Sequence, residues 1–268
     1  MKNIYSKEYQ NFLRKKKQKS IVILIIQIGI LVFLIGLWEL LARLNLIDTF
    51  ILSCPSNIVK VVVNLAKDGT LLYHMWTTLY EALLGFLIAT VIGTLVAILL
   101  WWNDTIYKIL DPYIVVLNSL PKIALGPVLI IWIGVGTKSI VAMDVLIMVV
   151  ITTLSMLNAF RACDQNKIML LRSMGASKFQ ILTKLILPNS LCDFISVLKI
   201  NVGLTWVGTI MGEYLVSKAG LGYLIVYGGQ IFNLDLVMAS TVLLCLMAGL
   251  MYFIVAFIEK RVNKKLKK

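Results

Sequence analysis

The sequence has few of the residues from which metal sites and disulfide frameworks are built. Its 268 residues include a single histidine, and its four cysteines lie far apart, with no CxxC pair among them. Zinc sites need several such ligands at short spacings, and disulfide scaffolds occur in cysteine-rich chains. We therefore expect neither a metal site nor a disulfide framework. The residues concerned are His74, Cys54, Cys163, Cys192 and Cys245.

Charged residues are also scarce, at 15% of the chain, whereas apolar residues make up 60% and mean hydropathy is +0.91. Soluble domains carry about 25% charged residues. A soluble core of this size could not hide so much apolar surface, and no polar stretch is long enough to form a separate catalytic domain. The length suits five or six membrane helices of about 20 residues each. We therefore expect an all-α polytopic membrane protein.

Six apolar stretches are long enough to cross a bilayer as helices of about 30 Å. The first follows a basic segment, is too long for the apolar core of a signal peptide and lacks a small-residue cleavage site, so we expect it to be retained. Pro112 is expected to open the third stretch. The predicted spans are 21–42, 77–101, 112–133, 139–158, 190–216 and 236–258.

The distribution of basic residues predicts the orientation. A net charge of +13 would suggest nucleic acid in a soluble protein, but here 19 Lys and Arg residues fall in the termini and in the connections on their side, against four on the other side. The positive-inside rule makes the richer side cytoplasmic. The predicted parts are a cytoplasmic basic N-terminus (1–20), a transmembrane domain (21–258) with a cytoplasmic loop (159–189), and a cytoplasmic basic C-terminus (259–268).

Two connections carry helix signals. In the external connection, Ser56 is expected to cap a short helix that Gly69 ends. In segment 159–189, Gly175 can end a helix over 166–174 in the left-handed conformation. Ser177, followed by a glutamine three residues later, matches a capping box for a second helix, which Pro188 is expected to stop. We predict a helix–Gly turn–helix that projects from the membrane; the alternative is an amphipathic connector lying on the lipid surface.

This cytoplasmic segment resembles the "EAA" loop of binding-protein-dependent ABC importer permeases. The family pattern is E-A-A, three residues, G, nine residues and I-x-L-P, and here Gly175-Ala176 is followed by Leu185-Ile186-Leu187-Pro188. In that family the loop forms the coupling helix that docks into a groove on the ATPase subunit. The resemblance implies an ATPase-coupling loop that includes Met169, Arg172, Gly175, Ala176, Ser177, Phe179, Leu187 and Pro188.

The resemblance covers about residues 50–260 and includes further motifs of the nitrate/sulfonate/taurine-type permeases. It implies a type I ABC importer permease fold in the bacterial inner membrane. It also implies a pair of permease copies, two cytoplasmic ATPases that bind ATP and Mg, and an external solute-binding protein. This chain would be no enzyme and would hold no cofactor. The matching motifs are Pro121–Pro127, Trp132–Gly134, Gly212-Glu213-Tyr214 and Gly220-Leu221-Gly222-Tyr223.

The chain departs from the family pattern at two places. Met169-Leu170-Leu171 replaces E-A-A, which removes a polar contact expected from the glutamate. Glu81 stands where many sulfonate-type relatives carry arginine. The second departure shifts the expected solute from anionic sulfonates towards the pyrimidine thiamine precursors of similar permeases.

Ionisable groups at membrane depth usually face a bundle interior or a watery path. We therefore predict that Glu213 lines the translocation path or its external gate; the alternative is an interfacial carboxylate with satisfied hydrogen bonds. Lys199 is expected to extend towards the interface or to bond helix-end carbonyls, Asp144 to pair with Lys138 at an interface, and Glu39 to mark a span boundary. The residues predicted for the path or gate are Glu213, Trp206, Lys122 and Glu81.

ATP hydrolysis is expected on a separate subunit. Residues 134–139 resemble a phosphate-binding loop only superficially, because the G-x4-G-K spacing and a preceding strand are missing. Two other functions remain open from the sequence. An ion-gradient-driven secondary transporter would show inverted repeats and broken helices with paired carboxylates, and a non-transport membrane scaffold would not need the helix–Gly–helix segment.

Overall fold

The computed structural model describes residues 7–266, which are helical along most of their length and contain no strand. The helices are α1 (Lys7–Arg43), α2 (Thr49–Leu52), α3 (Pro55–Lys67), α4 (Thr70–Trp102), α5 (Asp104–Ser119), the 3-10 helix η1 (Lys122–Leu125), α6 (Gly126–Ile133), α7 (Thr137–Arg161), α8 (Gln165–Ser173), α9 (Lys178–Ile181), the π-helical turn η2 (Leu182–Ile186), α10 (Leu187–Asn189), α11 (Leu191–Val216), α12 (Leu221–Gln230) and α13 (Leu234–Leu266).

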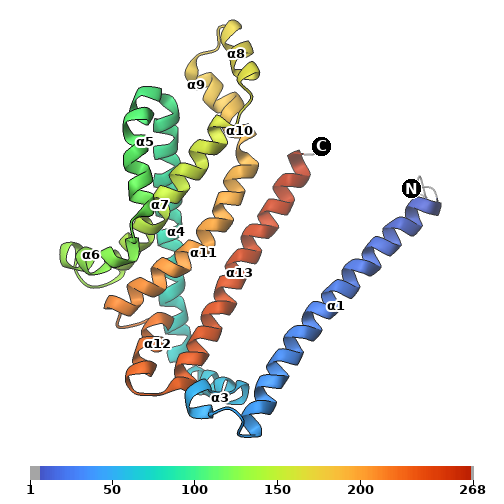
Figure 1. The fold of residues 1–268 in the computed structure, drawn as a ribbon, viewed down its shortest axis with the longest axis vertical. Helices are drawn as coiled ribbons and strands as arrows, with labels where there is room; N and C mark the ends of the chain where they lie inside the picture. The colour runs from blue at the N-terminus through green and yellow to red at the C-terminus, as the bar shows by residue number, and fades with distance from the viewer. Residues whose placement is uncertain (1–6, 267–268) are drawn as a thin grey trace.

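The core of the bundle is the packing of α4, α7 and α11, with α12 and α13 against them (Figure 1). Small residues let the helices approach closely: a Cβ atom on Gly93 of α4 would collide with Thr152 of α7. The buried residues Met148 and Trp206 lie in the apolar core that α12 and α13 complete. The outer faces of these helices are apolar as well, as expected where lipid is the solvent.

Two ends of the bundle are distinguished below. The α8 end carries α8 and α9, and the α3 end carries α3 and α12 (Figure 1). Both the first turns of α1 and the last turns of α13 point towards the α8 end. Within residues 7–266, five helices are long and apolar enough to cross a membrane, or six when one bent pair counts as a span. With the bent pair counted as a span, six crossings agree with α1 beginning and α13 ending on the same side.

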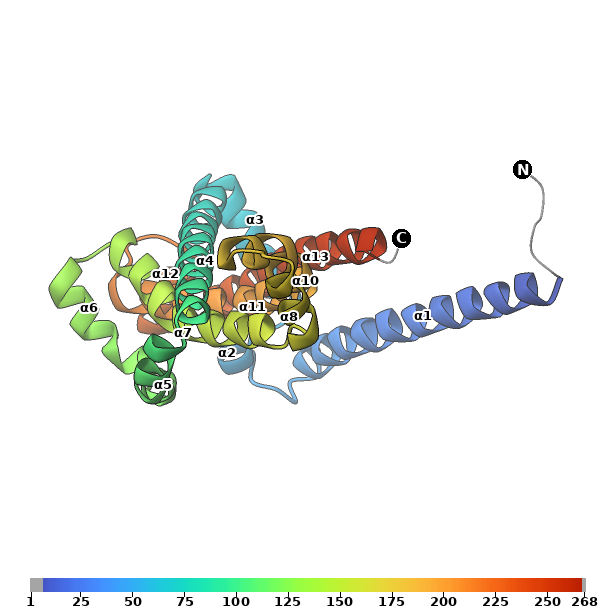
Figure 2. The same cartoon turned by 90° about the horizontal axis from the view of Figure 1, so that it is seen from above.

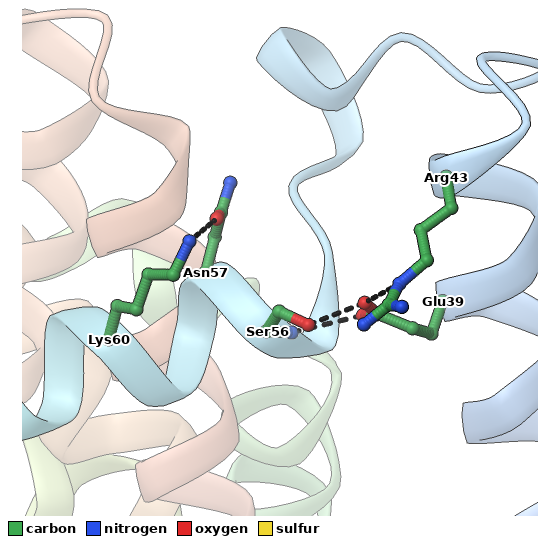
Figure 3. A network of polar contacts seen from close by, with 5 residues as sticks. All are labelled: Glu39, Arg43, Ser56, Asn57 and Lys60. Carbon is green, nitrogen blue, oxygen red and sulfur yellow. Dashed lines mark hydrogen bonds and ion pairs between the residues drawn. The ribbon is translucent and has the colours of Figure 1, made fainter.

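The first crossing helix, α1, diverges from the rest of the bundle (Figures 1 and 2). None of its apolar window is buried. It is tied to α3 by Glu39, which accepts hydrogen bonds from the main-chain N–H of Ser56 (3.1 Å) and from its hydroxyl, and which pairs with Arg43 at 2.8 Å (Figure 3). One sequence expectation, the Ser56 cap, is therefore wrong. Ser56 lies inside the first turn of α3, whose N-cap is Cys54. Glu39 lies near the C-terminal end of α1, close to the predicted span boundary, and also binds α3.

The third predicted span is a broken helix. It begins at Asp104, where Asn103 accepts from the N–H groups of Thr105 and Ile106 at 2.9 and 3.2 Å. The chain then bends by 86° between α5 and the η1–α6 pair. A continuous helix over 112–133 is therefore wrong, and Pro112 lies inside α5 instead of opening it. The break coincides with Pro121, which disfavours helical backbone at the residue before it.

Pro188 does not stop a helix, contrary to the prediction. The chain passes from α9 through η2 into α10, with Pro188 in the first turn of α10, where a missing N–H is tolerated. Ser190 is the non-helical residue between α10 and α11, whose N-cap it forms. The π-helical turn places Leu182 and Ile186 in a buried cluster with Phe160 of α7. This cluster fixes the helix–Gly–helix segment to the membrane bundle.

Candidate functional site

The helix–Gly–helix segment forms as the sequence predicts. Asp164 caps α8 by accepting from the N–H of Asn166 at 2.9 Å. Gly175 ends the helix with φ +82°, the left-handed conformation that glycine adopts without steric strain. The capping box then starts α9: the N–H of Ser177 donates to Gln180 Oε1 at 2.8 Å, and the Gln180 N–H donates to Ser177 Oγ at 3.3 Å. Local hydrogen bonds thus define the turn, which we name the coupling tip (residues 165–181).

The coupling tip presents an apolar surface. Met169, Met174 and Phe179 are all more than 60% exposed, while Ile168 on the opposite face of α8 is buried against the bundle. Of the predicted coupling residues, Met169, Arg172, Gly175, Ala176, Ser177 and Phe179 lie on the tip, whereas Leu187 and Pro188 lie behind it in α10. Large exposed apolar groups on a short, well-fixed element are typical of a surface that binds another protein.

A second concentration of functional groups lies inside the bundle. Glu81 of α4, Asp144 of α7 and Glu213 of α11 are each at most 2% exposed. Thr137 donates to Glu81 at 2.8 Å, Thr209 donates to Asp144 at 2.9 Å, and the N–H of Gly222 donates to Glu213 at 2.5 Å. We call these three acids the carboxyl cluster.

Glycines make room for two of these carboxyl groups. A Cβ atom on Gly85 of α4 or Gly208 of α11 would overlap the Asp144 carboxyl group from either side. Gly220, at φ +112°, and Gly222 leave the same kind of space around Glu213. Asp144 and Glu213 therefore occupy space that a larger residue at these glycine positions would fill. The close approach of α4 and α11 to α7, and of α12 to α11, depends on these positions staying small.

The carboxyl cluster has no neutralising cation among residues 7–266. The predicted pair of Asp144 with Lys138 is wrong, because Asp144 lies two turns inside α7 while Lys138 is exposed. One oxygen of each acid has no hydrogen-bond partner: Glu81 Oε2, Asp144 Oδ1 and Glu213 Oε1. Buried polar groups that are only partly bonded are costly and usually have a functional reason.

The family of the chain follows from comparison of its sequence with known proteins. Residues 89–268 match the family described as binding-protein-dependent transport system inner membrane component. The chain belongs to this family. The permease is similar to the taurine transport permease TauC of Escherichia coli K12, with 27% identity over 89% of the chain and 88% of the relative. It is also similar to the formylaminopyrimidine transport permease ThiX of Halalkalibacterium halodurans, with 30% identity over 71% and 75%.

Solved structures agree on the fold. The permease matches a chain of the MetNI methionine ABC transporter in an inward-facing conformation with a TM-score of 0.65 at 23% identity, over 72% of this chain and 96% of that one. It matches a chain of a bacterial alginate ABC transporter with a TM-score of 0.64 at 16% identity, over 94% and 98%. These structures confirm the predicted type I importer fold, and the family match confirms the identification as an ABC importer permease.

The structure brings only part of the predicted path residues of the permease together. Glu81 and Glu213 lie in the carboxyl cluster. Lys122 lies at the break of the third span and donates to the Asn118 carbonyl at 3.1 Å. Trp206 is buried in the apolar core, and its indole N–H has no acceptor among the described residues.

Sequence reasoning about the other ionisable residues of the permease was less successful. Lys199 forms an ion pair with Glu259 of α13, so the expected bond to helix-end carbonyls is wrong. His74 accepts at Nδ1 from the N–H of Gly220 at 3.0 Å, which fixes the start of α12. Asp144 was missed as a member of the carboxyl cluster, although glycines at positions 85 and 208 were signals of close helix approach.

Proposed function

We propose that an ATPase subunit docks on the coupling tip of this permease and drives the passage of a small solute through the bundle. The observation that supports this most directly is the exposed apolar surface of Met169, Met174 and Phe179 on a segment whose other face is buried against α4 and α7. A partner that binds and displaces this segment would also displace the membrane helices against which it packs. ATP and Mg would be held by the ATPase, and this chain would carry no cofactor and no catalytic group.

The proposed mechanism is a shift between two packings of the bundle. The coupling tip is fixed to the cluster around Phe160, at one end of α7, and the carboxyl cluster lies nearer the other end of the same helix. A rigid helix that moves at the α8 end must therefore change the contacts of Asp144. Binding of nucleotide by the ATPase would favour one packing and its release the other, which is alternating access as a population shift.

The assembly that we propose contains a second permease copy. The apolar faces of α1 and α6, including Ile131 and Trp132, are exposed in the single chain. A homodimer would cover part of this surface and enclose a path between the copies. The solute-binding protein would dock at the α3 end, which we propose is external, with both chain ends and the coupling tip in the cytoplasm, as the distribution of basic residues predicts.

Two classes of solute appear in the names of the relatives: the sulfonate taurine and the pyrimidine formylaminopyrimidine. Glu81 and Glu213 have no neighbouring cation in residues 7–266, and an anionic sulfonate near them would meet like charge or an unfavourable dipole. We therefore propose an uncharged or cationic solute such as a pyrimidine. Competition of labelled pyrimidine uptake by unlabelled taurine would decide: strong competition would favour the sulfonate instead.

Copurification tests the proposed function as a whole. The tagged full-length chain, extracted from native membranes, should bring down an ATPase whose retention varies little with salt, because Met169 replaces the charged residue of the family pattern. Uptake into membrane vesicles should require ATP and survive ionophores. Uptake that is driven by an ion gradient without ATPase would favour a secondary transporter, and absence of both partner and uptake would favour a scaffold.

A further inference from the structure

A basic pocket opens beside the coupling tip, at the α8 end of the bundle. Its volume is about 430 Å³, and its walls come from the corner between α4 and α5, from the last turn of α7 and from α8 and α9. Four cationic side chains line it against a single carboxylate. These are Lys108, Arg161, Arg172 and Lys178, against Asp104.

Two of the four cations are held in place by neighbouring groups. The Arg161 guanidinium lies 3.5 Å from the centre of the Tyr107 ring and bonds Asp104 at 3.3 Å. The Lys178 ammonium donates to the main-chain carbonyl of Trp102. These contacts orient the charges at small entropic cost, and Asp104 is the one carboxylate among the described residues that line the pocket.

The other two cations are unpaired. The side chains of Lys108 and Arg172 make no hydrogen bond or ion pair within the described part of the chain. They enter from different elements, α5 and α8, and converge on the same concave surface. Like charges gathered in a pocket repel one another, and a bound anion would remove that repulsion. The pocket therefore has the charge and the size for a phosphate group.

We propose that this pocket binds the phosphate headgroup of an anionic phospholipid. Trp101 in its wall and Trp102 beside it end a membrane helix, where tryptophan marks the lipid–water interface. On the helices that meet there, Leu99, Ile106 and Ile109 are exposed and would lie against acyl chains. Basic pockets between transmembrane helices recognise anionic headgroups in this way. A soluble phosphate ester would gain nothing from the apolar surroundings.

The headgroup would join the coupling tip to the α4–α5 corner of the bundle. Lys108 belongs to the α4–α5 corner, and Arg172 and Lys178 belong to the coupling tip. A phosphate between them adds charge-assisted hydrogen bonds to both sides. Anionic lipid would therefore stabilise the position of the tip relative to the bundle, and the activity of the assembled importer would depend on lipid composition.

Native mass spectrometry of the purified full-length chain tests the site. We expect the wild type to retain phosphatidylglycerol in preference to phosphatidylcholine. The double variant Lys108→Gln, Arg172→Gln should bind phosphatidylglycerol more weakly by on the order of tenfold. Neither side chain has a bond to lose, so the variant should unfold at the wild-type temperature, and this is measured alongside. The matched control is Lys260→Gln with Lys264→Gln, which removes the same charge from exposed positions of α13.

Each other outcome would overturn the proposal. Unchanged lipid binding in the double variant would remove the site, and an equal loss in the α13 control would mean diffuse surface attraction. If glycerol phosphate displaced the lipid at equal concentration, the pocket would be a site for soluble phosphate esters. If Lys108→Gln reduced ATPase copurification and left lipid binding unchanged, the pocket would belong to the protein interface instead.

Discussion

At the scale of single residues, a buried acid in a membrane bundle needs both hydrogen-bond donors and space. Asp144 has Thr209 as its donor and lies between Gly85 and Gly208, on the two neighbouring helices. The glycines are therefore part of the acid's environment as much as the threonine is. Replacing Thr209 by a residue without a donor, or filling the space with a larger residue at either glycine position, should weaken the packing of α7 against α4 and α11.

Gly208→Ala should destabilise the bundle. The added Cβ atom would overlap the Asp144 carboxyl group and lie 3.0 Å from the Asp144 Cα atom, so a main-chain shift is needed. Overpacking of this kind costs about 1–3 kcal/mol, which predicts a decrease in Tm of about 5 °C in detergent. Gly203→Ala, five residues earlier in α11 and with open space around its Cβ position, is the control and should leave Tm unchanged or raise it. Equal effects would mean that the space around the Asp144 carboxyl group is not tightly packed.

Glu213→Gln should impair transport without disrupting assembly. The amide oxygen can still accept from the N–H of Gly222, so α12 should keep its start, but the carboxyl group shared with the cluster is lost. If the cluster is the gate, the uptake rate should fall on the order of tenfold, which lies within the range of typical coupling between two sites. The same change at Glu259, which pairs with Lys199 near the other end of the bundle, should have a smaller effect. Full uptake by Glu213→Gln would assign this acid a structural role.

Prediction from sequence worked best for residues whose local neighbours determine their role. The Gly175 turn and the Ser177 capping box are set within a few residues, and both are confirmed. The site of Asp144 depends on glycines 59 and 64 positions away in the chain. Its predicted partner, Lys138, was chosen for proximity in sequence, which could not reveal that α4 and α11 enclose the Asp144 carboxyl group.

At the scale of elements, long apolar helices were predicted and their breaks were not. Periodicity and length identify α4, α7 and α11, because a bilayer demands about 20 apolar residues whatever the tertiary structure. The 86° bend after α5 depends on where the chain can turn and on what covers the exposed carbonyls. Pro112 and Pro121 look alike in the sequence, yet only Pro121 coincides with the bend.

Gly175→Val should uncouple the permease from its ATPase. Valine at φ +82° costs about 1–3 kcal/mol, and the strain falls on the α8–α9 turn, since nothing else lies within 4 Å of the added Cβ position. Insertion and the membrane helices should be unaffected. ATPase copurification or transport-linked ATP hydrolysis should fall.

The control for this prediction is Gly69→Val. Gly69 has φ +71° and equally open surroundings, but it lies between α3 and α4 at the opposite end of the bundle. The backbone strain is therefore matched, and only the location differs. If both variants lose ATPase binding to the same extent, the effect is a general loss of stability; if neither does, the coupling tip is not the docking surface.

At the scale of the whole molecule, the proposed solute path lies between two copies of the chain. The polar interior of the single chain consists of hydrogen-bonded networks, such as Asn201 between Thr90 and Thr152 at 3.0 and 3.1 Å, and these hold helices together. Exposed apolar side chains lie on α1 and α6, and also on the outer faces of α4, α5 and α13. In the proposed assembly, the solute path forms between this chain and a second copy.

Orientation in the membrane is the last prediction, and it rests on charge and on the arrangement of the ends together. The α8 end carries the basic segment 159–189, and the first turns of α1 and the last turns of α13 point towards it, so the positive-inside rule predicts that it is cytoplasmic. In a cysteine-free background, Leu170→Cys on the coupling tip should react with a membrane-impermeant maleimide only after the membrane is opened. Ala66→Cys on α3 should react in intact cells. Both positions are exposed, so accessibility of the side chain itself does not limit either reaction. Reversed labelling would place the coupling tip outside, where no ATPase could reach it, and would contradict both the topology and the docking role.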